Sequence, residues 1–201
     1  MVMPKIVDHD RRRQELAQAA ISVIENSGLD GLRLVDVGKA AGATTGTVTH
    51  YLGDKKTVLI AALDQVAYSI EHTMRPAADT AHDLVESFCD LLPTSDLQRK
   101  DWRVWIAYWG GAIGDEELAD RHRGHYDRFR RQLADRIRRL PGRKDLPHPP
   151  DMCADLMISA LDGVGTRATL EPDHWPPDRQ KIHLRALLAP LFTPNKTPAP
   201  V

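Results

Sequence analysis

Residues 40–56 read AAGATTGTVTHYLGDKK, and the structure of this stretch decides the fold of the chain. Its centre is rich in β-branched residues, which favour extended backbone. These residues are Thr44, Thr45, Thr47, Val48 and Thr49. The segments on both sides carry helical periodicity instead. The stretch is therefore either a strand between two helices or a short helix. In the second case its weak helix formers are explained by what their side chains contact.

The rest of the chain favours helices. Apolar residues recur at three- and four-residue spacing in segment after segment, and most prolines and several glycines fall between these segments. We find no convincing strand and no internal repeat, so the spacing predicts an all-α fold. The expected helices span 10–27, 34–41, 55–74, 79–92, 101–113, 115–140, 151–170 and 178–192, with Pro190 disturbing the last turn.

Within this pattern, residues 34–41 and 44–52 form two short helices joined by Gly42 and Ala43, which is the layout of a helix-turn-helix. Thr44 suits the N-cap of the second helix, because its hydroxyl accepts a backbone N–H from the first turn. Val48 and Leu52 then face the core. Polar side chains point outward, where they suit phosphate oxygens and base edges. The alternative is a polar, solvated helix without a partner.

Residues 36–55, DVGKAAGATTGTVTHYLGDK, resemble the DNA-binding signature of the TetR family of bacterial repressors. The THYLGDK ending is similar to the choline-responsive BetI branch of that family. Three segments of the second half resemble the BetI-type C-terminal domain: WRVWIAYW at 102–109, RHRGHYDRFRRQLADRIRR at 121–139 and LMISALDGVGTRATLEP at 156–172. The resemblance covers residues 8–192.

The sequence departs from the family pattern at four places. Leu32 and Arg33 stand where the family usually has threonines. Gly38 replaces an alanine and is expected to weaken its helix by up to about 1 kcal/mol. Ala43 replaces a larger apolar residue, and Thr49 replaces a phosphate-binding tyrosine. These changes are compatible with the family fold. Their main expected effect is on which operator sequence the protein recognises.

The resemblance implies a DNA-binding transcriptional regulator, in most members a repressor, that binds a near-palindromic double-stranded DNA operator as a homodimer and is released by a small-molecule effector. It implies a helix-turn-helix DNA-binding domain over 1–54 and a helical effector-binding and dimerisation domain over 55–192, connected by the long helix 55–74. Residues 193–201 are expected to be a disordered tail. The expected DNA-binding residues are Arg33, Thr44, Thr45, Gly46, Thr47, Thr49, His50, Tyr51 and Lys55.

Effector and dimer contacts are expected in the second half. The expected ligand-binding residues are Tyr68, Phe88, Trp105, Trp109 and Tyr126; the alternative is that these aromatic side chains are core. The BetI likeness makes choline or a related cationic amine one conceivable effector. Dimerisation is expected through 151–170 and 178–192, where small residues allow close approach, or else these faces pack inside one subunit. The small residues are Ala160, Gly163, Gly165 and Ala168.

The charge distribution indicates a second candidate surface for nucleic-acid binding, besides the helix-turn-helix. The formal net charge is −1, so DNA binding needs locally gathered cations, and residues 121–144 are strongly basic. Such a run is more often a solvated helix face that is paired with acidic residues. Arg11, Arg12 and Arg13 are either DNA-backbone contacts or a solvated helix start.

No catalytic or metal-binding pattern, cofactor fingerprint, secretory signal or membrane-spanning run is found, and Cys89 and Cys153 are expected to be buried and unpaired. We therefore expect a cytoplasmic, nucleoid-associated protein without a cofactor that is not an enzyme. Two rival functions remain open: an all-α interaction protein that has lost specific DNA binding, and a small enzyme.

Overall fold

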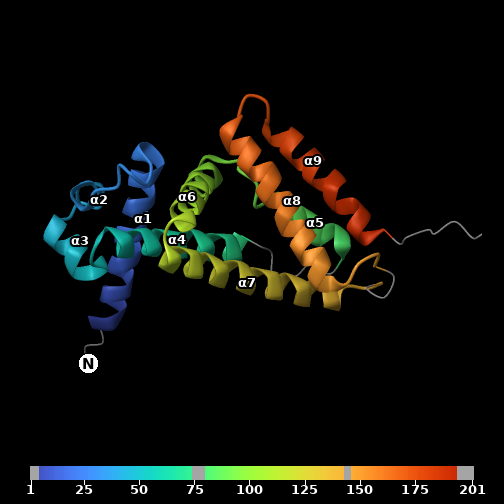
Figure 1. The fold of residues 1–201 in the computed structure, drawn as a ribbon, viewed down its shortest axis with the longest axis horizontal. Coiled ribbons are helices and arrows are strands. Elements are labelled where there is room, and N and C mark those ends of the chain that lie inside the picture. Colours follow the sequence, from blue (N-terminus) through green and yellow to red (C-terminus); the bar gives the residue numbers. More distant parts are fainter. Residues whose placement is uncertain (1–4, 74–79, 143–145, 194–201) are drawn as a thin grey trace, which may run out of the picture. The chain divides into compact units, whose positions relative to one another are not determined.

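The computed structural model describes residues 5–73, 80–142 and 146–193, and this part of the chain is helical without a strand (Figure 1). The predicted all-α fold is confirmed. The helices are α1 Lys5–Ser27, α2 Leu34–Ala40, α3 Thr45–Leu52, α4 Lys55–Thr73, α5 Ala81–Cys89, α6 Asp96–Ile113, α7 Glu116–Arg139, α8 Pro150–Leu170 and α9 Pro177–Leu188, followed by the 3₁₀ turn η2 Ala189–Phe192. Pro76, Arg143, Lys144 and residues 194–201 of the predicted tail lie outside the described residues.

Besides the end of α9, three helix boundaries differ from the predicted ones by three residues or more, and the first is the start of α1, at Lys5 rather than at residue 10. Helix α6 begins at Asp96 rather than at residue 101, because Ser95 and Gln98 cap its first turn reciprocally. The Gln98 N–H donates to Ser95 Oγ over 3.3 Å, and the Ser95 N–H donates to Gln98 Oε1 over 2.9 Å. Helix α5 ends at Cys89 rather than at residue 92. Pro190 does end regular helix, since η2 replaces the last turn of α9 as expected.

The described chain forms two compact units. The first unit runs to Ser69 and includes Arg99–Arg123; the second unit takes Ile70–Gln98 and the chain from Gly124 onward. Helices α4, α6 and α7 contribute residues to both units. The division into domains at residues 54 and 192 stays a prediction.

The core of the first unit is built from α1 to α4 and α6. Leu16 and Ala20, one turn apart on α1, are fully buried, as are Val37 of α2 and Val48 of α3. Each buried side chain of Val or Leu size stabilises the fold by about 1.5–3 kcal/mol. This packing supplies the stability that α2 and α3 lack as isolated short helices.

The second unit packs α5, the later part of α7, and the antiparallel pair α8 and α9 (Figure 1). Its buried core includes Leu84, Leu133, Met157 and Leu184, one residue from each of these helices. Cys89 and Cys153 are buried and free, as predicted. Among the described helices, none combines the length and the apolar character needed to span a bilayer.

Candidate functional site

The threonine-rich stretch is a helix, and Thr44 begins it. Thr44 has extended backbone angles, and its Oγ1 accepts the N–H of Thr47 over 3.1 Å. The Oγ1 atoms of Thr44 and Thr47 also lie 3.0 Å apart. The cap satisfies a backbone donor of the first turn that has no partner within the helix. The predicted N-cap role of Thr44 is confirmed.

The turn before α3 depends on two glycines. Gly42 has φ +59°, in the left-handed region that glycine enters without strain. The Ala43 N–H donates to the carbonyl oxygen of Gly38 over 2.8 Å, and a Cβ on Gly38 would lie 3.0 Å from the Ala43 carbonyl oxygen. Gly38 costs helix propensity, as expected from the sequence, but its missing side chain lets the turn pack against α2.

Helix α3 separates a buried face from an exposed one. Val48 and Leu52 are 0% and 1% exposed, so they anchor the helix in the core as predicted. The exposed residues are Thr44, Thr45, Gly46, Thr49 and His50, and Thr47 is half-buried. The outer face thus presents hydroxyls and an imidazole around a glycine, a set that suits phosphate and base-edge contacts.

Tyr51 ends this face and is half-buried. Its ring lies 4.8 Å from the ring of His9 and 5.0 Å, edge to face, from that of His50. Arg13 Nη1 donates to the Tyr51 carbonyl oxygen over 2.6 Å. This contact ties α1 to the end of α3, so Arg13 has a structural role that the sequence did not predict.

Two predicted DNA-binding cations, Arg33 and Lys55, lie at the edges of the motif and also have local contacts. Lys55 Nζ donates to the Asp30 carbonyl oxygen over 3.2 Å, and Arg33 Nε donates to Asp36 Oδ2 over 2.6 Å. Both side chains are exposed. Because neither contact buries its charge, contact with DNA stays a prediction for both residues.

We expect Thr44→Ala to lower the free energy of unfolding by about 1 kcal/mol, because it removes the N-cap of α3. Thr44→Ser keeps the hydroxyl and should stay close to the parent. Urea denaturation followed by circular dichroism measures both. Equal stability of the two variants would contradict a capping role.

Three of the predicted ligand-binding residues lie in the first unit, at different depths. Tyr68 is exposed on α4, whereas Trp105 is 7% exposed on α6. The ring of His122 lies 6.0 Å from that of Trp105 and 6.4 Å from that of Trp109. Trp109 Nε1 is buried and has no hydrogen-bond partner within the described residues. A buried N–H without an acceptor costs free energy, so this donor is a candidate for a hydrogen bond to a ligand.

The other two lie in the second unit. Phe88 is fully buried and stacks on Phe129, with 5.9 Å between ring centroids, so it packs in the core. Tyr126 is half-buried, and its hydroxyl donates to Asp162 Oδ2 over 2.8 Å. Ligand contact stays a prediction for all five residues.

Asp162 was missed by sequence reasoning, since a lone aspartate in an amphipathic helix gives no signal. Burial raises its pKa to about 6, against the opposing effect of the hydrogen bond from Tyr126. The carboxylate is thus less stable in its charged form when the protein is folded. A residue that destabilises the fold at neutral pH is a candidate for function.

We expect Asp162→Asn to stabilise the protein at pH 7.5 by about 2 kcal/mol more than at pH 4. The folded pKa lies above the unfolded value, so the folded state binds the proton more tightly. The contribution of Asp162 to the free energy of unfolding should therefore fall as pH rises from about 4 through about 6. Asp173→Asn, which removes an exposed carboxylate shortly after the same helix, is the control. Chemical denaturation across this pH range tests the difference, and a gain that does not vary with pH would contradict it.

The basic stretch is partly compensated by carboxylates. Arg121 pairs with Asp64 over 3.0 Å, and Arg138 pairs with Asp135 over 2.7 Å. Further pairs join Arg123 to Glu116 and Asp120, Arg130 to Asp127 and Asp155, and Arg138 to Asp151. These pairs favour a solvated helix face over a rival nucleic-acid surface.

The predicted dimerisation helices expose apolar side chains. The exposed residues are Met152, Leu156 and Leu170 on α8 and Ile182 and Leu187 on α9. Gly163 is exposed, and a Cβ on it would meet no atom within 4 Å. Gly165 and Ala168 are buried, so these two small residues pack inside the subunit rather than on an outer face.

Comparison with known proteins agrees with this architecture. The family described as "BetI-type transcriptional repressor, C-terminal" matches residues 80–193. The regulator BetI of Stenotrophomonas maltophilia (strain R551-3) is 29% identical over 174 residues, which cover 84% of this chain and 86% of the relative.

Solved structures share the fold. A transcriptional regulator from Rhodococcus sp. Rha1 superposes with a TM-score of 0.78 at 23% identity, covering 89% of this chain and 95% of that one. A regulator from Saccharomonospora viridis, solved in complex with choline, gives a TM-score of 0.77 at 21% identity and covers 90% and 96% of the two chains. The chain belongs to the TetR family of transcriptional regulators and carries the BetI-type C-terminal domain.

Proposed function

We propose that this regulator is a repressor that binds a near-palindromic operator as a homodimer and is released by a small-molecule effector. The outer face of α3 carries the proposal. It combines exposed threonines and a histidine with Gly46, while Val48 and Leu52 fix the helix in the core. As a dimer, the protein would place two such helices in successive major grooves, roughly 34 Å apart or somewhat more.

The homodimer is supported by the apolar side chains exposed on α8 and α9. Exposed leucine, isoleucine and methionine on two adjacent helices favour a helix-packed contact with a second copy. Two helices from each subunit would then form a four-helix bundle.

The effector is expected to carry a hydrogen-bond acceptor and an apolar or cationic body. The unpartnered Trp109 Nε1 supports the acceptor, and the rings of Trp105 and Trp109, both in the first unit, support contact with the body. Because a related structure contains choline, choline and similar amines are the first compounds to test. Isothermal titration with choline, betaine aldehyde and polyamines measures this, and no heat from any of them would reject the amine class.

The decisive experiment is fluorescence anisotropy on DNA fragments selected from the upstream region of the chain's own gene, at several salt concentrations. We expect sequence-selective binding that weakens steeply with salt, since Lys and Arg release counterions from phosphates. A regulator that acts this way is no enzyme and works in the cytoplasm at the nucleoid. Equal, weak binding to every fragment calls for selection from genomic fragments, and an empty selection would favour an interaction protein that has lost DNA reading.

A further inference from the structure

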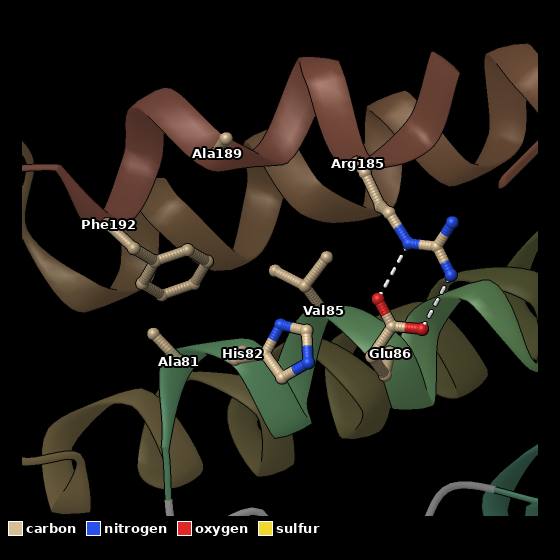
Figure 2. Close-up of a pocket in the computed structure, with 7 residues that line it drawn as sticks. All are labelled: Ala81, His82, Val85, Glu86, Arg185, Ala189 and Phe192. Carbon is tan, nitrogen blue, oxygen red and sulfur yellow. Dashed lines mark hydrogen bonds and ion pairs between the residues drawn. The ribbon is translucent and has the colours of Figure 1, made fainter. Parts of the chain in front are cut away.

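Between α5 and the α9–η2 segment, the second unit contains an open cavity of about 520 Å³ (Figure 2). This volume is in the range of sites for small organic molecules. The cavity is separate from the residues that carry the proposed repressor function, because no predicted DNA-binding or ligand-binding residue lines it. The lining residues are Ala81, His82, Val85, Glu86, Arg185, Ala189 and Phe192.

Most of the cavity wall is apolar. Figure 2 shows the ring of Phe192 beside Ala81 and Ala189, with Val85 at the centre of the wall. Val85 is 8% exposed, so the protein core lies directly behind this part of the wall. These four side chains carry no hydrogen-bonding group, and they suit the hydrocarbon part of a ligand.

A neutralised ion pair forms the other end of the cavity. Arg185 Nε and Nη2 each donate to a different carboxylate oxygen of Glu86 over 2.7 Å (Figure 2). This geometry with two parallel hydrogen bonds holds both charged groups in place, and each charge neutralises the other. The pair therefore presents polar atoms to the cavity without a net charge.

The other charged groups around the pair have mixed signs. Lys181 and Asp178, both on α9, carry opposite charges and do not line the cavity. Asp83 Oδ2 accepts the N–H and the hydroxyl of Thr80, so this carboxylate is occupied at the start of α5. His82 lines the cavity, and a neutral imidazole can both donate and accept a hydrogen bond. Charge selection at this end is therefore set by the ion pair.

The ion pair opposes a charged ligand group of either sign. A carboxylate beside Arg185 also meets Glu86, and an ammonium beside Glu86 also meets Arg185, so neither ion recovers the free energy that it loses on leaving water. A hydroxyl group can use both partners at once. It can accept from Arg185 Nη1, which takes no part in the two bonds of the pair, and donate to a carboxylate lone pair of Glu86.

We propose that this cavity binds an uncharged amphiphile that carries a hydroxyl group. The hydroxyl lies at the Glu86–Arg185 pair, and the hydrocarbon chain or ring packs against Val85 and Phe192. The apolar wall accounts for the hydrocarbon part, and the neutralised pair accounts for the absence of charge. The cavity therefore differs in ligand class from the proposed effector site, for which cationic amines are the first compounds to test.

Three probes with the same eight-carbon chain separate charge from hydrophobic contact: octanol, octanoate and octylamine. Isothermal titration of the full-length protein measures each without DNA, at pH 8, which disfavours the imidazolium form of histidine. We expect octanol to bind at least about tenfold more tightly than either ion. Equal affinities for the three probes, tighter binding of either ion, or no binding of octanol would overturn the proposal.

Two variants of the ion pair test the origin of this selectivity. Glu86→Gln leaves the charge of Arg185 without a counter-ion, so octanoate should bind about threefold to tenfold more tightly than it binds the parent. Arg185→Gln leaves the charge of Glu86, so octylamine should gain by a similar factor. Both side chains are partly exposed, so either variant should fold. An unchanged ranking of the probes in both variants would show that the pair does not contact the ligand, and would overturn the proposal.

A third variant locates the binding. Ala81→Trp places a large side chain at the apolar end of the cavity and should abolish binding of octanol. Ala40→Trp, at an exposed alanine that ends α2 in the first unit, is the matched control and should bind octanol as the parent does. Octanol affinity that Ala81→Trp does not reduce would place the alcohol elsewhere and overturn the proposal.

Failure of this proposal is distinct from failure of the proposed repressor function. Probe binding is measured without DNA, and DNA anisotropy of the same parent protein is measured without probes. The variant proteins are checked for helix content by circular dichroism and for assembly state by light scattering, so a loss of octanol binding reports on the cavity.

Discussion

Replacing Gly46 by glutamine should lower the affinity of the protein for a selected DNA fragment by about 100-fold without lowering its free energy of unfolding. Gly46 lies in the first turn of α3 on the exposed face. A side chain there would stand between the helix backbone and DNA. Glutamine is a better helix former than glycine, so the folded protein should be unchanged or slightly more stable.

The fold gives no reason for a glycine at this position. Gly46 does not have a left-handed backbone, unlike Gly42 and Gly53. A Cβ on Gly46 would meet only the Thr44 hydroxyl, at an ordinary distance of 3.6 Å. Glycine inside a helix costs about 1 kcal/mol relative to alanine. We infer that the cost is offset by close approach of the α3 backbone to DNA.

The control for this prediction is Gly124→Gln. Gly124 is an exposed glycine of α7 whose added Cβ would meet no atom within 4 Å. It should gain stability in the same way and keep its DNA affinity. Anisotropy titrations and urea denaturation of both variants test the pair. Unchanged DNA affinity of Gly46→Gln would remove α3 from the DNA interface.

The helix-turn-helix could be predicted because its determinants are local. The glycine turn at Gly42, the cap at Thr44 and the buried pair Val48 and Leu52 all lie within a few residues of one another, and each was found in the structure as expected. The start of α6 was missed although Ser95 and Gln98 form a capping box, because the polar residues after it hid the apolar periodicity.

The features that the sequence did not predict depend on contacts between distant segments. Asp162 is unusual only because Tyr126, on another helix, and the surrounding core enclose it. The cavity above Val85 exists because Phe192, over a hundred residues later, covers one end of α5. Periodicity reports which face of a helix is apolar but not which segment covers that face.

The aromatic residues also show that the sequence does not predict which segments pack together. Phe88 and Trp105 are both buried aromatic residues of helices, yet Phe88 stacks on Phe129 inside the second unit while Trp105 lies near His122 in the first. Both rings are buried, which agrees with the core alternative, whereas contact with a ligand depends on which helices enclose each ring.

The second prediction of a large effect concerns the exposed face of α9. Ile182→Glu should convert the dimer to a monomer and reduce affinity for a two-half-site fragment by about 100-fold to 1,000-fold. Ile182 is 60% exposed on α9, so the substitution removes no core contact. In a symmetric dimer it occurs twice, placing two carboxylates in the apolar contact. A monomer also loses the linkage that makes binding of the second half-site intramolecular.

The matched control is Ile113→Glu, which places the same charge at a 90% exposed isoleucine at the end of α6 in the first unit. It should remain a dimer and keep its DNA affinity. Light scattering gives the assembly state. Anisotropy on fragments with one and with two half-sites distinguishes a loss of dimerisation from a loss of DNA recognition. If Ile182→Glu is a monomer that binds one half-site as well as the parent does, α9 holds the subunits together without taking part in DNA reading. If it remains a dimer, this face of α9 is not the contact, and exposed Leu156 on α8 becomes the next position to charge.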